Sequence, residues 1–364
     1  MSTTEPFQNR VRNRRLARDW SQSELAGRAG ISRAAVSAIE GNRLVPSVAA
    51  ALALASVLEC SVEELFSMSE GRDQPDSNIR WAWEPVGLSH RFWCARIQDR
   101  IWFYPAEATA IGEVPHDGLA AADAQLSQVL TAKGKNAALL SDKTLVIAGC
   151  DPAVGLLTRL YERTTGYRML AFTRSSRQAL ELVARGLVHA GGVHLSSLDE
   201  RQGNAKPVRD VLKEPARLLR VTDWQEGIAV GSSVTATSVR GVLKERLAWI
   251  GREPGSGARQ CLDQLLQGRL SPKRTARDHR SVAEAIRNGW ADAGVCLRLV
   301  ADEAGLRFLP IRTEGYDFCV RQSVEQDPRV RALIQVLQSP ELKQLMGELP
   351  GYDSRWSGQV ISVE

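Results

Sequence analysis

The N-terminal region contains two helix-start signals and one helix-stop signal in close succession, which leaves little freedom in how it can fold. Ser21 and Glu24 have the spacing of a capping box, in which the Ser hydroxyl accepts from a first-turn amide and the Glu carboxylate accepts from the cap amide. Gly30 tolerates the left-handed backbone that ends a helix, and Ser32 can cap the next one. The predicted helices are Gln22–Ala29 and Arg33–Glu40.

Apolar residues around this pair predict a small helical domain. A basic helix over residues 7–18, with Val11 and Leu16 as its apolar contacts, precedes the pair, and two closing helices follow it. Three short helices with a glycine-containing turn between the second and third form the helix-turn-helix pattern. The residues predicted to face inward are Leu25, Ala26, Ile31, Val36 and Ile39, followed by Leu52, Leu54, Leu58, Leu65 and Phe66 of the closing helices.

Positive charge is concentrated in this domain. The formal net charge of the 364-residue chain is only +5, but residues 7–43 hold eight arginines against three acidic residues. Clustered arginines neutralise the phosphates of DNA. The alternative is a helical bundle that binds protein and has the arginines on a solvated face. The agreement of caps, turn and basic face favours DNA.

Residues 8–66 resemble the Cro/C1-type (XRE) helix-turn-helix, most clearly over SQSELAGRAGISRAAVSAIEGNRL. The resemblance implies double-stranded operator DNA as the partner, with the third helix in the major groove and the start of the second helix at the phosphates. Arg33 is the strong candidate reader, because its guanidinium can bond guanine bidentately. The implied DNA-binding residues are Gln22, Ser23, Ser32, Arg33, Ala34, Ser37, Ala38, Asn42 and Arg43.

A polar linker and a tryptophan-rich segment follow. Residues 69–80 contain Gly71 and Pro75 and are predicted to form the linker. Residues 91–97 and 100–104 predict a β-hairpin that turns at Gln98 and Asp99, and residues 119–132 predict a helix. Core packing is the preferred interpretation of the four tryptophans at positions 81, 83, 93 and 102; a ligand box or a dimer contact is the alternative.

From Asp142 onward the pattern alternates between strands and helices. Residues 144–148, 167–172 and 187–193 are strand-like, and residues 153–163 and 178–185 have helical spacing. This order predicts a mostly parallel sheet that binds ligands at the carboxyl ends of its strands. A second such unit begins near Thr235. Its predicted elements are strands at 246–250 and 291–297 and helices at 258–267 and 281–288, before a returning strand at 316–320 and helices within 328–349.

These segments resemble the periplasmic-binding-protein-like sensor domain related to molybdate-binding proteins. The resembling stretches are GCDPAVGLL, RGLVHAGGVHL, REPGSGAR, DHRSVAEAIRNGWADAGV and ELPGYDSRWSGQV. The resemblance implies a type II fold of two α/β lobes joined by a hinge, with a ligand in the cleft. The residues that it places around the cleft are Cys150, Asp151, Ser175, Ser176, His194, Arg252, Ser256, Gly257, Arg259, Asp292 and Tyr316.

Each of these residues also has a purely structural interpretation. Asp151 can cap the following helix with Pro152 as the first helical residue, and Ser175 and Ser176 can be caps as well. Cys150 can be a buried small hydrophobe. The remaining residues can be internal hydrogen-bonding, solvated or hinge residues.

The effector stays open between two classes. Serine hydroxyls, helix-start amides and arginines suit a molybdate-like oxyanion. A carboxylate at Asp151 disfavours an anion unless it points away, which favours an organic metabolite with both donor and acceptor groups.

Other functions find little support in the sequence. No two cysteines have zinc-knuckle spacing, so we expect no metal site and no cofactor. We expect no catalytic residues, although an enzyme that uses Cys150, Asp151, His194 and Asp292 is one alternative. The N-terminus lacks a signal peptide and no segment is apolar enough to span a membrane, so we expect a cytoplasmic protein that does not bind membranes.

The sequence therefore predicts a multi-domain chain, with an all-α helix-turn-helix domain followed by a two-lobed α/β sensor. We expect a one-component transcriptional regulator that binds DNA as a homodimer or higher oligomer and responds to a small molecule. A ligand-independent dimeric repressor is the other alternative. The expected parts are the helix-turn-helix domain (7–68), the linker (69–80), a connecting segment (81–140) and the sensor (141–364), with lobe I at about 141–230 and 320–364 and lobe II at about 231–319.

Overall fold

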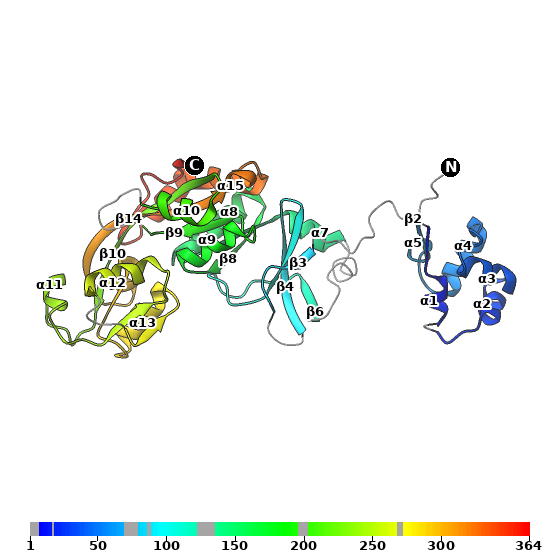
Figure 1. The fold of residues 1–364 in the computed structure, drawn as a ribbon, viewed down its shortest axis with the longest axis horizontal. Helices are drawn as coiled ribbons and strands as arrows, with labels where there is room; N and C mark the ends of the chain where they lie inside the picture. Colours follow the sequence, from blue (N-terminus) through cyan, green and yellow to red (C-terminus); the bar gives the residue numbers. More distant parts are fainter. Residues whose placement is uncertain are drawn as a thin grey trace. The chain divides into compact units, whose positions relative to one another are not determined.

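The computed structural model describes residues 7–16, 18–68, 79–85, 89–121, 135–195, 203–267 and 272–364. It divides the chain into two compact units, Met1–Ser77 and Asn78–Glu364, which are considered separately (Figure 1).

The first unit is a helical domain closed by a two-stranded ribbon. Its elements are β1 (Phe7–Asn9), α1 (Val11–Leu16), α2 (Gln22–Ala29), α3 (Arg33–Glu40), α4 (Val48–Val57), α5 (Val62–Leu65) and β2 (Phe66–Met68). The two predicted central helices are confirmed at both ends. Ser21 and Glu24 form the capping box, Gly30 ends α2 in the left-handed conformation, and Ser32 caps α3.

The ends of the first predicted helix were wrong. Residues 7–9 form β1, which pairs antiparallel with β2, so the helix begins only at Val11. Val11 is buried as expected, whereas Leu16 and Leu52 are more than half exposed and do not contribute to the core. Among the predicted core residues, Leu25, Ala26, Val36, Ile39, Leu54, Leu58 and Leu65 are buried, and Ile31 and Phe66 are half-buried against them. Ala29 and Ala55 also belong to this core and were not predicted.

A buried ion pair ties the first three helices together. The Arg15 guanidinium bonds both carboxylate oxygens of Glu40, at 2.7 and 3.0 Å, and the backbone carbonyl of Trp20 at 2.6 Å. The Gln22 side-chain amide donates to the same Glu40 carboxylate at 2.9 Å. This network fixes the angle between α2 and α3, the two helices of the DNA-binding motif.

The second unit begins with a four-stranded sheet in the order β3-β5-β4-β6. Its strands are β3 (Ile79–Trp81), β4 (Ser89–Ile97), β5 (Arg100–Pro105) and β6 (Gly118–Ala121). The predicted hairpin is confirmed as β4 and β5. The helix predicted at 119–132 was wrong over 119–121, which belong to β6, and its remainder lies outside the described residues. Trp93 is fully buried and Trp83 packs edge-on against Phe172, so the tryptophans contribute to core packing.

The rest of this unit has two lobes built on one ten-stranded sheet, in the order β12-β11-β13-β10-β14-β9-β7-β8, with β15 and β16 also paired to β10. Lobe I contains α7 (Lys135–Asp142), β7 (Thr144–Gly149), α8 (Val154–Thr165), β8 (Arg168–Thr173), α9 (Ser176–Ala184), β9 (Ala190–Val193), α10 (Ala205–Leu212), η1 (Gln322–Val324), α15 (Pro328–Gln338), α16 (Pro340–Gly347), β15 (Tyr352–Asp353) and β16 (Val360–Val363). Lobe II contains α11 (Val239–Val242), β11 (Trp249–Arg252), α12 (Gly257–Leu266), β12 (Arg274–Ala276), α13 (His279–Arg287), β13 (Ala293–Leu297) and α14 (Arg298–Glu303).

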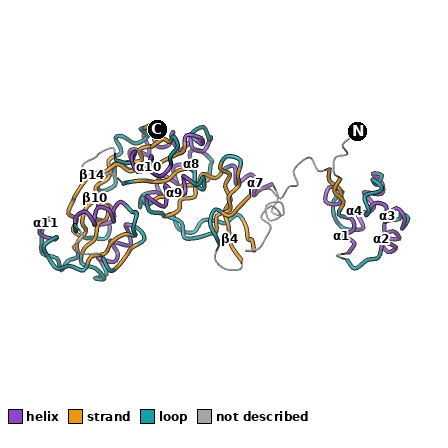
Figure 2. Tube along the Cα trace, viewed as in Figure 1, coloured by secondary structure: helices purple, strands orange, loops and turns teal. Residues whose placement is uncertain are grey.

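Two long antiparallel strands, β10 (Ala216–Val230) and β14 (Arg307–Arg321), run through both lobes (Figures 1 and 2). The strand predicted at 316–320 is only the last part of β14, and β10 was not predicted. The strand predicted at 246–250 corresponds to β11, which the structure places slightly later in the chain, at Trp249–Arg252. Buried charges on β10 and β14 interrupt the apolar pattern that would have revealed them.

Two glycines of lobe I leave room for a buried tyrosine. A Cβ atom at Gly192 or Gly149 would overlap the Tyr316 hydroxyl. Tyr316 is 1% exposed and stacks on Trp224 with ring centroids 4.5 Å apart. The strand ends of lobe I therefore pack directly against an aromatic ring of β14.

We predict that Gly192→Ala lowers the free energy of unfolding by about 1–3 kcal/mol, the usual cost of overpacking a tight core. The matched control is Gly155→Ala in α8, where a Cβ atom would make only ordinary contact with Ile111. Chemical denaturation of both variants measures the difference. Equal stability of the two variants would contradict the packing described here.

Candidate functional site

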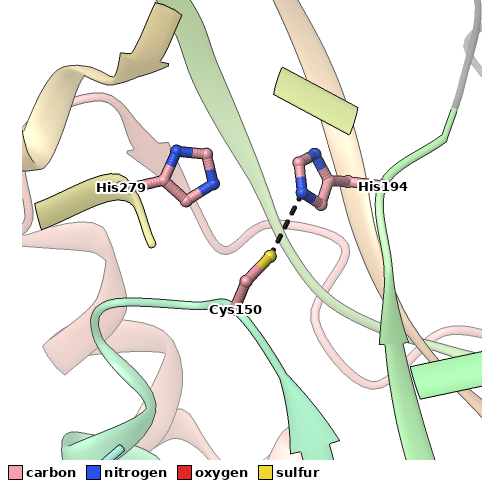
Figure 3. Close-up of side chains that lie close together, drawn as sticks. All are labelled: Cys150, His194 and His279. Carbon is pink, nitrogen blue, oxygen red and sulfur yellow. Dashed lines mark hydrogen bonds between the residues drawn. The ribbon is translucent and has the colours of Figure 1, made fainter. Parts of the chain in front are cut away.

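Three side chains from the two lobes meet at the carboxyl ends of the strands. Cys150 follows β7, His194 follows β9, and His279 is the first residue of α13, shortly after β12. The Cys150 Sγ lies 3.2 Å from His194 Nε2, and one donor atom of each residue lies within 4.8 Å of the others (Figure 3). All three side chains are buried. We call these residues the Cys–His cluster.

Glu314 fixes the orientation of the His194 ring. His194 Nδ1 lies 2.8 Å from Glu314 Oε1, so its Nε2 is directed toward Cys150. Burial opposes protonation of His194, but the Cys150 sulfur and the Glu314 carboxylate outweigh it and raise the pKa of His194 well above its ordinary value. The two ring nitrogens of His194 therefore each lie against a group that can hydrogen-bond to them.

Glu314 is itself held by residues of β10 and β14. The Trp224 indole donates to its Oε1 at 3.2 Å, and Arg312 lies 2.9 Å from its Oε2. Arg312 also pairs with Glu226 at 2.7 Å. Burial together with the neighbouring Glu314 charge raises the pKa of Glu226 to about 7. This chain of contacts connects the strands shared by the lobes to the His194 ring.

His279 and Arg252 bring unused hydrogen-bonding groups to the region of the Cys–His cluster. Among the described residues, both ring nitrogens of His279 and the Nη1 of Arg252 are buried without a hydrogen-bond partner. Burial, then the charges of Arg252 and His194, lower the pKa of His279 well below its ordinary value, so its ring is neutral. The other face of Arg252 is paired with Glu253 through two contacts of 2.9 Å. Buried polar groups are usually satisfied, so such a concentration of unpartnered polar atoms marks a binding position.

The lobes are closed over the cluster. The Arg177 amide of lobe I donates to the Gly255 carbonyl of lobe II at 3.3 Å, and Arg280 of lobe II reaches the Pro152 carbonyl at 3.3 Å. Gly257, at the start of α12, packs so tightly on His194 that a Cβ atom would overlap it. Groups from both lobes therefore enclose the Cys–His cluster.

A cavity of about 700 Å³ opens beside the closed cleft. It is lined from lobe I by Thr173, Arg174 and Gln178, from lobe II by Glu253 and residues 275–278, and from the segment after β5 by residues 107–110. Its volume lies within the range of small-molecule sites.

Most of the predicted cleft residues do lie around the cluster. The Ser176 hydroxyl accepts from the His194 amide at 3.2 Å, and the Tyr316 hydroxyl bonds the backbone of Cys150 and Asp151. The Asp151 carboxylate accepts from the Tyr352 hydroxyl at 2.7 Å and from the Ala153 amide at 2.9 Å. Contact between any of these residues and a ligand stays a prediction.

Some assignments need correction. Pro152 is not the first residue of α8, which begins at Val154 after the N-cap Ala153. The Asp151 carboxylate still accepts from the Ala153 amide at 2.9 Å, so it stabilises the start of this helix from a shifted position. Asp292 accepts from the Ala248 amide at the amino end of β13, on the edge of the sheet away from the cluster.

Three further residues have structural partners. Ser175 and Ser256 cap α9 and α12, and Arg259 bonds Asp263 at 2.8 Å and the Arg252 carbonyl at 3.3 Å.

Four residues at the cluster were not predicted from the sequence: His279, Glu314, Trp224 and Arg312. His279 looked like an ordinary first-turn residue. The other three lie on the long strands that the apolar pattern did not reveal. The charged residues that recur within 312–320 were the available signal, because charges inside a buried strand need partners.

In the first unit, the predicted DNA-binding residues surround the exposed side of α3. Arg33 and Ala34 are exposed, and Ser37 and Ala38 are half-buried. Arg43 Nη2 lies 3.5 Å from the Ser37 hydroxyl, and Asn42 adopts the left-handed backbone. Ser32 is occupied as the α3 cap, and the Gln22 amide is bonded to Glu40, so their side chains have structural roles as well.

Two protein-family models match the chain. The model described as a PBP superfamily domain matches residues 157–338, half of the chain, and a helix-turn-helix model matches residues 11–65. The chain belongs to the PBP superfamily domain family. Its N-terminal domain is a helix-turn-helix of the Cro/C1 (XRE) type, as the sequence predicted. The pairing supports a DNA-binding regulator that senses a small molecule.

Several known proteins are similar to this PBP-family chain. The uncharacterized protein YvgK of Bacillus subtilis (strain 168) is 28% identical over 228 residues, which cover 60% of this chain and 73% of YvgK. A putative phosphate transporter substrate-binding protein from Clostridium perfringens, solved with phosphate, has a TM-score of 0.46 at 9% identity and covers 57% of this chain and 99% of its own. The effector-binding domain of QuiR, solved with shikimate, has a TM-score of 0.40 at 8% identity, with 53% and 94% covered.

We predict that the Glu226→Gln variant becomes more stable relative to the wild type as pH rises. The folded pKa of about 7 lies above the ordinary glutamate pKa of 4.5, so ionisation of Glu226 destabilises the folded state progressively between these pH values. From pH 5 to pH 8 the difference in unfolding free energy should shift toward the variant by on the order of 2 kcal/mol. Urea titrations at the two pH values measure it, and a constant difference would contradict the assignment.

Proposed function

We propose that this chain is a one-component transcriptional regulator whose operator binding is modulated by a small molecule bound between its sensor lobes. The observation that carries the proposal is the set of buried polar atoms of His279 and Arg252 in lobe II that have no partner among the described residues, with His279 placed against Cys150 and His194 of lobe I inside a closed cleft. A ligand that contacts both lobes binds the closed arrangement better than the open one and shifts the population toward it.

The helix-turn-helix domain supplies the DNA-binding half of this function. Helix-turn-helix proteins bind half-sites one helical turn apart, about 34 Å, as dimers. We therefore propose a homodimer or higher oligomer on double-stranded operator DNA, acting in the cytoplasm. No helix within the described ranges is long and apolar enough to cross a membrane.

Two effector classes remain candidates for the cleft. An organic metabolite fits the 700 Å³ cavity, which has polar groups of both kinds along its wall. A molybdate-like oxyanion would use Arg252, Ser176 and the helix starts. A thermal-shift titration with molybdate, tungstate, sulfate and a metabolite panel distinguishes them, because a ligand at 100 times its Kd adds roughly 2.7 kcal/mol of stability. A flat response to every compound would favour the ligand-independent repressor.

We predict that the effector found in that titration changes operator affinity. Operator fragments are first selected from a random DNA pool with the full-length chain, and affinity is then measured by fluorescence anisotropy with and without effector. A change of at least about fivefold is expected, the lower end of usual allosteric coupling. Unchanged affinity at saturating effector would contradict modulation.

We predict that Arg33→Ala weakens binding to the selected operator by about 1–3 kcal/mol and relaxes the sequence preference at one position. The reason is loss of a bidentate contact to a base edge from an exposed residue at the start of α3. The control is Arg331→Ala, an exposed arginine of α15 in lobe I. Equal losses for the two variants would exclude base reading by Arg33.

A second candidate function rests on one geometric observation. Cys150, His194 and Glu314 have the order of a nucleophile, a base and an orienting carboxylate. Turnover of a bound ester or thioester by the wild type, lost in Cys150→Ser, would establish an enzyme. We propose instead that the cluster binds without turnover.

A further inference from the structure

We propose that Cys150, His194 and His279 form a binding site for a single thiophilic transition-metal ion of the Zn²⁺ or Cu⁺ class, which bridges the two lobes. This inference rests on the proposed function, because it names a metal ion as the species that holds the cleft closed.

The donor set is the first argument. Thiolate and imidazole are the side chains that bind zinc and copper most strongly, whereas alkaline-earth ions prefer oxygen. One donor atom of each residue lies within 4.8 Å of the others. A tetrahedral zinc ion holds sulfur and nitrogen donors about 3.5 Å apart, from bond lengths of about 2.3 and 2.0 Å. The observed 3.2 Å between Cys150 Sγ and His194 Nε2 is close to that separation.

The unpartnered His279 ring is the second argument. It is fully buried at the start of α13, and neither of its nitrogens has a partner in the part of the chain that the structure describes. An imidazole nitrogen that makes no hydrogen bond to the protein is available to bind a metal ion. Figure 3 shows the His279 and His194 rings on either side of the Cys150 sulfur. An ion placed among them would be coordinated by one nitrogen of each ring and by the sulfur.

The support behind His194 is the third argument. Metal-binding histidines usually donate their second ring N–H to a carboxylate, which sets the tautomer and the ring orientation. Glu314 provides this support at 2.8 Å and is steadied by Trp224 and Arg312. The ion would take the place of the proton shared by Cys150 Sγ and His194 Nε2.

The surrounding charges permit a cation. Arg252 faces the cluster but is paired with Glu253, and Arg312 is paired with Glu226 and Glu314. The Cys150 thiolate then supplies the negative charge that a bound ion neutralises. Lobe I contributes Cys150 and His194 and lobe II contributes His279, so the ion has all three ligands only when the lobes are closed.

The test uses full-length protein freed of metal by a chelator and kept reduced with a phosphine. Co²⁺ is the spectroscopic probe. We expect one Co²⁺ per chain, a thiolate-to-metal charge-transfer band, and displacement of Co²⁺ by Zn²⁺ or Cu⁺.

The variants are Cys150→Ser and His279→Gln. Their matched controls are Cys60→Ser and His116→Gln, which change a cysteine and a histidine outside the cluster. Circular dichroism verifies that each variant folds; His279→Gln removes no hydrogen bond.

Cys150→Ser should lose the charge-transfer band, and His279→Gln should weaken binding at least about 100-fold, since losing a residue that only orients a ligand already costs about 10–100-fold. Glu314→Gln removes only the orienting carboxylate, so it should weaken metal binding by about 10–100-fold and keep the charge-transfer band.

Absence of stoichiometric metal, or a band that survives in Cys150→Ser, would overturn the site. Metal binding by the wild type that leaves operator affinity unchanged would overturn the bridging role. If oxyanions or metabolites alter operator affinity while no metal binds, the regulator stands and this inference fails.

Discussion

The buried ion pairs of β10 and β14 are the interactions on which the sensor depends. These strands are the continuous elements shared by both lobes, and they carry charges into the interior. Arg220 bonds Asp317 at 2.6 Å, and Arg312 bridges Glu226 and Glu314. Because an unpaired buried charge costs several kcal/mol, each arginine fixes its carboxylate in place. Glu314 in turn orients His194, so the geometry of the cleft follows from the hinge strands.

This arrangement explains why the binding groups lie where the lobes meet. The strand ends of lobe I provide Cys150 and His194, and lobe II provides Arg252 and His279. The orphaned groups of lobe II would be solvated in an open cleft, but they lose water when the lobes close. A ligand that satisfies them offsets that cost, which makes closure dependent on the ligand. In the function proposed above, such closure would couple ligand binding to operator binding by the helix-turn-helix domain.

Much of this architecture was predictable from the sequence. The helices at 22–29 and 33–40 were predicted at both ends, because their caps are local and involve residues three positions apart. The alternation of strands and helices in lobe I, and the cleft position of Cys150, His194 and Arg252, followed from local patterns and from resemblance. The charges inside β10 and β14 concealed the hinge, because a strand of paired buried charges has no apolar period. The convergence of His279 with Cys150 and His194 depends on three loops far apart in the chain, and no short-range spacing announces it.

Hydrogen–deuterium exchange during an effector titration measures whether the two lobes close on the ligand. Cys150 and His194 follow strands of lobe I, and Gly257 is the first residue of α12 in lobe II; all three lie around the cluster. We expect their amides to become protected together, with a midpoint at the effector concentration that changes operator affinity. Protection confined to one lobe, or a change in operator affinity without any protection, would contradict lobe closure as the link between the cleft and DNA.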